Sequence, residues 1–283
     1  MKTIDVILPI GKPGAPTGNE VPELTRYDGQ TLIDWAVREA VQARANRILL
    51  VAPEGHAPAQ MIARHLWRSI RSHKSAAVNG RLRMDFLFHP VTDEEGWDGV
   101  VRAAALQCRG DQALLIDPTI ALTTADRIVP YASFTLRKVS ERIGDMPLCA
   151  LAELPWDEAL SMPVVTGPGL APADDVPGSD RLKVFAGRAV LPLPLPRLAR
   201  SATGAFPFDT LISTLHDAQV QPIQLLLKPR DARFVQPGEA AKETGPDGQT
   251  DPQGMALLAY EPALAPAILN GTGFAANASF RAG

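Results

Sequence analysis

This sequence of 283 residues has only two cysteines, no long apolar run and no large excess of either charge. Its two cysteines, Cys108 and Cys149, stand in neither a CxxC nor a zinc-ligand spacing, which argues against a disulfide framework and a structural zinc. No apolar run approaches the roughly 18 residues that cross a bilayer, and the apolar stretch within residues 1–14 is too short for a signal peptide. We therefore expect a soluble, cytoplasmic protein that does not associate with membranes.

Charge and motif content argue against several function classes. Lysine and arginine total 28 against 31 aspartates and glutamates, and this net charge of −3 gives no electrostatic footprint for nucleic acid. The five histidines fall in no HxxxH or HExxH spacing, and the GxSxG elbow of a serine hydrolase does not occur. The sequence therefore favours neither a nucleic-acid-binding protein, nor a histidine metal centre, nor a Ser-His-Asp hydrolase.

The first 117 residues alternate between apolar runs and amphipathic segments. Residues 4–10 form an apolar run typical of a buried strand, and residues 31–43 place apolar side chains on one helical face. The same patterns predict strands over 47–52, 83–88 and 113–116, and helices around 61–70 and over 97–108. Alternation of this kind predicts an α/β fold with a mostly parallel sheet and helices on both faces.

Two of the predicted strands end at candidate site residues. Ligands bind beyond the carboxyl ends of the strands in sheets of this type, and Gly11 and Asp117 stand at two of those ends. Gly11 opens the loop GKPGAPTG (11–18), which matches neither the dinucleotide nor the P-loop fingerprint, so its Lys12 either contacts a phosphate or is solvated. Asp117 precedes a proline, so it either ligates Mg²⁺ carried by a nucleotide or forms a turn.

Seven segments, taken in order, resemble the motifs of a known family. They are VILPIG (6–11), VPEL (21–24), YDGQTLIDWAVREAV (27–41), RILLV (47–51), GWDGVVRAAALQCRGDQALLID (96–117), VFAGRAVLPLPL (184–195) and FDTLISTL (208–215). In this order they resemble the first strand, signature loop, first helix and later motifs of the bacterial UTP–glucose-1-phosphate uridylyltransferases. These enzymes form part of the wider sugar-phosphate nucleotidyltransferase family.

The resemblance implies a three-layer, Rossmann-like nucleotidyltransferase core with a mixed, mostly parallel sheet. It also implies UTP and glucose-1-phosphate as substrates, with Mg²⁺ required if the protein is active and Asp117 as a metal ligand. The nucleotide-binding positions and the one candidate catalytic residue, Lys12 in place of a missing arginine, follow from the same comparison. The nucleotide-binding positions are Pro9, Ile10, Gly11, Gly14 and Gly96.

The later part of the chain is less regular, with strands predicted over 162–165, 182–191 and 223–227 and a helix over 209–218. By resemblance, residues 1–240 form one nucleotidyltransferase-like domain. Its nucleotide-binding part is 1–150 and its sugar-side part is 151–240. Residues 241–283 are expected to form a Gly/Ala/Pro-rich C-terminal tail.

The signature loop departs from the family pattern, which has the form G-x-G-T-R and then places lysines around a proline. The arginine is missing here, Asn19 stands at the first lysine position, and Glu23 replaces the lysine after the proline. A carboxylate at a phosphate site is repulsive. Of the family's metal-binding aspartate pair only Asp117 remains, because Gln236 stands at the second position. These losses predict weak or absent uridylyl transfer.

Three functions follow as alternatives. The first is a weakly active or inactive sugar-1-phosphate nucleotidyltransferase. The second is a non-catalytic protein that binds a nucleotide or nucleotide sugar as a sensor or regulatory subunit. The third is a scaffold that acts through a protein partner or as a homo-oligomer, with the proline run 192–196 or the tail as the contact. Nucleotide binding separates the first two from the third.

Overall fold

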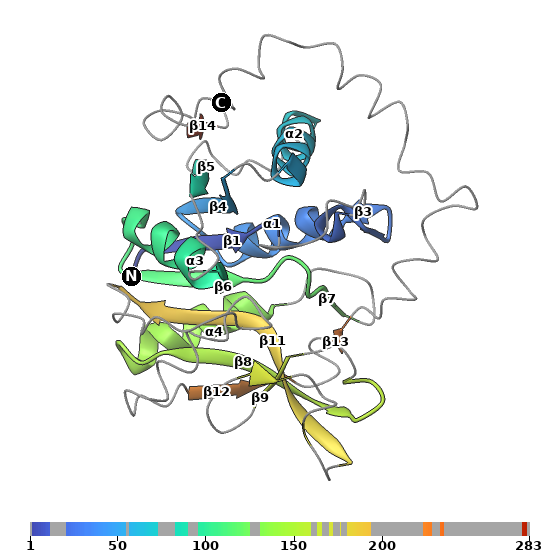
Figure 1. Cartoon of the computed structure of the whole chain (residues 1–283). Coiled ribbons are helices and arrows are strands. Elements are labelled where there is room, and N and C mark those ends of the chain that lie inside the picture. Colours follow the sequence, from blue (N-terminus) through green and yellow to red (C-terminus); the bar gives the residue numbers. More distant parts are fainter. Residues whose placement is uncertain are drawn as a thin grey trace, which may run out of the picture.

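A mixed sheet, to which the described residues contribute ten strands, runs through the centre of the molecule in the computed structural model (Figure 1). The structure describes residues 2–11, 21–54, 57–72, 83–89, 96–124, 131–159, 163–165, 170–171, 176, 180–193, 223–227, 233–234 and 279–281. The strands of the sheet are β1 (Ile4–Pro9), β4 (Arg47–Pro53), β5 (Arg83–His89), β6 (Gln112–Ile116), β8 (Leu148–Pro155), β9 (Val164–Val165), β10 (Leu170–Ala171), β11 (Arg181–Pro192), β12 (Ile223–Leu226) and β14 (Ser279–Arg281).

The core of the sheet is parallel, and antiparallel strands extend it. Strands β5, β4, β1 and β6 lie side by side and run in the same direction. The long strand β11 then pairs antiparallel with β6 on one side and with β8 on the other, and β12 continues the sheet beyond β8. Strand β14 pairs antiparallel with β5, which brings three residues of the 241–283 segment onto the sheet.

Helices cover both faces of the sheet, so the molecule has three layers. Helices α1 (Leu32–Gln42), α2 (Ala57–Ser72) and α4 (Ala132–Ile143) pack on one face, and α3 (Gly96–Gln107) packs on the other. Alternation along β1 shows the division, because Val6 and Leu8 point to the first face and Ile7 points to α3. None of the helices in the described ranges is long and apolar enough to span a bilayer.

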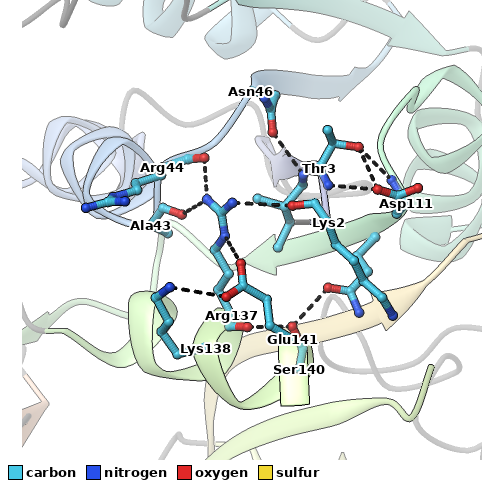
Figure 2. Close-up of polar contacts among 12 residues, drawn as sticks. Lys2, Thr3, Ala43, Arg44, Asn46, Asp111, Arg137, Lys138, Ser140 and Glu141 are labelled. Atoms are coloured by element: carbon cyan, nitrogen blue, oxygen red, sulfur yellow. Dashed lines mark hydrogen bonds and ion pairs between the residues drawn. The ribbon is translucent and has the colours of Figure 1, made fainter. Parts of the chain in front are cut away.

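Helix α1 is defined by a cap at each end. At its start the Thr31 Oγ1 accepts a hydrogen bond from the backbone N–H of Asp34, as an N-cap does. At its end the buried Arg137 of α4 donates to the carbonyls of Ala43 and Arg44, at 2.6 and 2.5 Å (Figure 2). These carbonyls follow the last helical turn and have no partner within the helix. Arg137 therefore ties α4 to the C-terminal end of α1.

The predicted fold class is confirmed, and so are the strand and helix assignments within the first 117 residues. The strand predicted over 182–191 is β11, and the one predicted over 223–227 is β12. Two elements of the core, α4 and β8, were not predicted from the sequence. The helix predicted over 209–218 lies outside the described residues.

Candidate functional site

The first candidate residues lie where the parallel strands end, an edge that we call the carboxyl edge. Pro9 is the last residue of β1 and lies opposite Val51 of β4. The N–H of Ile10 still donates to the carbonyl of Val51, at 2.9 Å, and Gly11 then turns away with a φ of 75°. A positive φ is the conformation that glycine adopts at no steric cost. Gly11 is thus the first residue beyond the sheet.

Asp117 lies at the same edge, directly after the neighbouring strand β6. Its side chain is buried, and the residue is only 3% exposed. One carboxylate oxygen, Oδ1, accepts hydrogen bonds from both the N–H and the Oγ1 of Thr119, at 2.9 and 2.6 Å. Burial raises the pKa of Asp117, and the two Thr119 bonds and the charge of Arg188 partly oppose that rise. The result is a rigid carboxylate for which ionisation is costly.

A backbone hydrogen bond to strand β11 fixes the position of Asp117. The N–H of Asp117 donates to the carbonyl of Gly187 at 2.8 Å. Gly187 has a φ of 67° and lies where the pairing of β11 with β8 shifts register, between Phe185 and Ala189. A Cβ at Gly187 would lie 3.0 Å from the Cβ of Asp117 and 3.2 Å from Ile120. Only glycine allows β11 to approach this closely.

A buried ion pair supports the same turn. The guanidinium of Arg188 donates to the carbonyls of Ile120 and Ala186, and its Nη2 lies 2.7 Å from Oε2 of Glu39 on α1. Glu39 also accepts a hydrogen bond from Ser133 of α4, at 2.5 Å. Both charged side chains are almost fully buried. The Arg188–Glu39 pair therefore connects β11, α1 and α4 to the turn that follows Asp117.

Glu23, the acidic residue at a lysine position of the signature loop, is buried beside the end of β1. It lies in a 3₁₀ turn, η1 (Pro22–Leu24), and is only 2% exposed. Its Oε1 accepts a hydrogen bond from the backbone N–H of Gly11 at 2.7 Å, while its buried Oε2 has no hydrogen-bond partner within the described residues. Burial raises the pKa of Glu23, hydrogen bonds from the backbone N–H groups of Gly11 and of Glu23 itself partly oppose that rise, and the negative charge of Asp117 adds to it. The carboxylate is thus held against the first residue of the signature loop.

Of the three remaining candidate site residues, the structure describes only Gly96. Gly96 is the first residue of α3, the helix that connects β5 to β6. Lys12 and Gly14 lie outside the described residues. Sequence reasoning missed the Arg188–Glu39 pair, although an arginine within the apolar run LKVFAGRAVL (182–191) is a signal that such a residue has a buried partner.

Asp117 is the carboxylate at the carboxyl edge that could hold Mg²⁺. No group of three or more metal-binding side chains occurs within the described ranges. Mg²⁺ that accompanies a nucleotide needs only one or two carboxylates, because phosphates and water supply its other ligands. Asp117 fits that requirement, since it is a fixed carboxylate at the carboxyl edge and its ionised form lacks full compensation. It would hold the ion together with a bound nucleotide.

Comparison with solved structures identifies the fold. Similar structures include a UDP-glucose pyrophosphorylase complexed with UDP-glucose, 12% identical with a TM-score of 0.60, where the match covers 83% of this chain and 92% of that one. This chain has the UDP-glucose pyrophosphorylase fold. The UTP-bound UGPase from Acinetobacter baumannii is 14% identical with a TM-score of 0.59, and the match covers 93% of this chain and 96% of that one.

A third similar structure carries a different nucleotide. HddC from Yersinia pseudotuberculosis, complexed with GMP-PN, is 11% identical with a TM-score of 0.54, and the match covers 84% of this chain and 96% of that one. No family model matches the sequence, and no curated protein matches it. The resemblance drawn from the sequence segments is thus confirmed by the fold, at very low sequence identity.

Proposed function

We propose that this protein binds a uridine nucleotide or a nucleotide sugar at its carboxyl edge and catalyses uridylyl transfer weakly or not at all. The observation that carries the proposal is that Gly11 and Asp117 follow the ends of two adjacent parallel strands, β1 and β6. This is the position at which open α/β sheets bind ligands. Solved structures of the same fold carry UDP-glucose and UTP, which supports a uridine nucleotide as the ligand.

Asp117 is the residue that we assign to the metal. Bound Mg²⁺ would supply positive charge to the phosphates of the nucleotide, which is the usual chemical role of this ion. Asp117 would hold the ion through its carboxylate, one oxygen of which Thr119 fixes, while Gly187 fixes its backbone. The backbone around Ile10 and Gly11 would contact the nucleotide. Lys12 remains the proposed partner of a phosphate.

Weak transfer follows from the charges at the edge. Glu23 stands at a position where the family, by the sequence resemblance, has a phosphate-binding lysine, and its carboxylate lies on the backbone of Gly11. Arg188 is the buried cation whose charge acts on Asp117, but its guanidinium donates to Glu39 and to two carbonyls. Loss of one charged contact to a transferring phosphoryl group typically costs a few kcal/mol in the transition state.

The test is a binding titration followed by an assay of transfer. Thermal shifts of the full chain with UTP, UDP-glucose and glucose-1-phosphate, each with and without Mg²⁺, should show stabilisation by a uridine ligand. A ligand at 100 times its Kd adds about 2.7 kcal/mol. Asp117→Asn should remove the Mg²⁺-dependent part of that stabilisation, while Asp145→Asn, at an exposed carboxylate, should not.

Release of pyrophosphate from UTP and glucose-1-phosphate then separates enzyme from sensor. Turnover far below that of an active uridylyltransferase, together with clear binding, agrees with the proposal. Absence of any shift with all three ligands contradicts it and leaves the protein-partner scaffold as the surviving alternative.

A further inference from the structure

The N–H of Gly11 is a hydrogen-bond donor in the position of an anion-binding group. The preceding N–H, of Ile10, still completes the sheet by donating to Val51. Gly11 is therefore the first backbone donor at the end of β1 that the sheet does not use. Free backbone N–H groups at such a position bind phosphate and carboxylate oxygens well.

In this structure that donor is already taken by an anion from the chain itself. The carboxylate of Glu23 accepts from Gly11 at 2.7 Å, a short distance typical of a hydrogen bond to a charged acceptor. The contact is fully buried and spans twelve positions of the sequence. A carboxylate and a phosphate present the same kind of oxygen acceptor, so Glu23 occupies the place of a ligand's anionic group.

The backbone of Glu23 is fixed independently of this contact. The N–H of Leu24 donates to Val21 and that of Thr25 donates to Pro22, which closes the η1 turn. The N–H of Leu32, at the start of α1, donates in turn to the carbonyl of Thr25. The hydrogen bonds that close the turn therefore do not depend on the contact between Glu23 and Gly11.

The buried carboxylate is also poorly compensated. Its Oε2 has no hydrogen-bond partner among the residues that the structure describes, and burial together with the charge of Asp117 outweighs the backbone hydrogen bonds that favour its ionised form. A buried polar atom without a hydrogen-bond partner is destabilising. The contact is thus well formed at one oxygen and unfavourable at the other, which makes it displaceable.

From this geometry we infer that Glu23 is an internal competitor for the phosphate group of the ligand. Its carboxylate holds the N–H of Gly11 until a phosphate displaces it, which weakens binding of every phosphate-bearing ligand at this edge. The inference deepens the proposed function and rests on it for the identity of the nucleotide. The anion site itself is tested with inorganic pyrophosphate, which carries neither base nor sugar.

The experiment compares the wild type with Glu23→Gln and Glu23→Ala by isothermal titration calorimetry. Glu23→Gln removes the charge and keeps an oxygen acceptor for Gly11, whereas Glu23→Ala removes both. We expect pyrophosphate to bind about tenfold or more tightly to each variant than to the wild type, because a like charge has been removed from the site. Uridine, which has no phosphate, should bind with unchanged affinity. Glu153→Gln, at an exposed carboxylate on β8, controls for net charge.

Three results would overturn the inference. Equal pyrophosphate affinity in all proteins, or no binding to any of them, would mean that Glu23 does not compete with an anion. If the Glu23→Ala variant is less stable and binds pyrophosphate no more tightly than the wild type, Glu23 has a structural role in stabilising the fold and does not compete with an anion. A gain for pyrophosphate without any binding of UTP or UDP-glucose would leave the competition intact and contradict the proposed function alone.

Discussion

The buried Arg188–Glu39 pair should be the most sensitive single point of the fold. Both side chains lie almost out of reach of solvent, and three hydrogen bonds join them. Arg188→Met removes the cation and leaves the carboxylate of Glu39 with the hydroxyl of Ser133 as its remaining partner among the contacts described above. Breaking a buried pair at one partner costs about 3–5 kcal/mol, because an uncompensated charge stays buried.

A loss of that size is a large fraction of the total stability of a domain, which is about 5–15 kcal/mol. Arg188→Lys should fall between the wild type and Arg188→Met. A lysine keeps the charge but cannot bond Glu39 through a planar fork and reach the carbonyls of Ile120 and Ala186 as well. The double variant Arg188→Met/Glu39→Met should recover much of the loss, since an apolar pair of similar volume replaces both charges.

Urea unfolding followed by circular dichroism and by tryptophan fluorescence, to which the buried Trp35 contributes, measures these differences. Lys183→Met, at an exposed position of the same strand, is the matched control and should change the free energy of unfolding by less than about 0.5 kcal/mol. The reasoning is refuted if Arg188→Met costs less than about 1 kcal/mol. It is also refuted if the double variant is less stable than both single variants.

Three further predictions concern other parts of the fold. Gly187→Ala should destabilise by about 1–3 kcal/mol more than Gly144→Ala in urea unfolding, because both have a positive φ but only Gly187 lacks room for a Cβ. Arg137→Met should cost roughly 2–4 kcal/mol, as the carbonyls at the end of α1 lose their donor. Burial raises the pKa of Cys108 and of Cys149 to about 12, so both should react with a thiol reagent at pH 8 far more slowly in the native protein than in denaturant.

The parallel core could be predicted because its sequence pattern and its environment agree. Strands β1, β4 and β6 are buried on both faces, and the sequences of such strands are nearly continuous apolar runs. Helix α4 escaped prediction because its buried face is partly polar and carries Ser133, Arg137 and Ser140. A search for apolar periodicity does not detect a face that is satisfied by hydrogen bonds instead.

Some positions of the candidate site could likewise be predicted from the sequence, and others could not. Gly11 and Asp117 could be predicted, since each directly follows a recognisable strand. The position of Glu23 could not, because its contact with Gly11 depends on how the intervening loop returns to the sheet. The sequence showed only that a negative charge replaced a positive one. The Arg188–Glu39 pair joins residues 149 positions apart, a distance over which no local pattern carries information.

The energetics of Asp117 separate what the fold requires from what a ligand requires. The fold fixes the backbone at this position through Gly187 and holds one side-chain oxygen through Thr119. An asparagine oxygen could accept the same two hydrogen bonds, and it would avoid burying a charge. Folding alone therefore gains nothing from a carboxylate whose pKa burial raises. A bound cation beside Asp117 would stabilise its ionised carboxylate. Asp117→Asn should therefore leave the free energy of unfolding unchanged or higher, and it should abolish Mg²⁺-dependent nucleotide binding. A variant that loses stability and keeps that binding would assign Asp117 to the fold and not to the ligand.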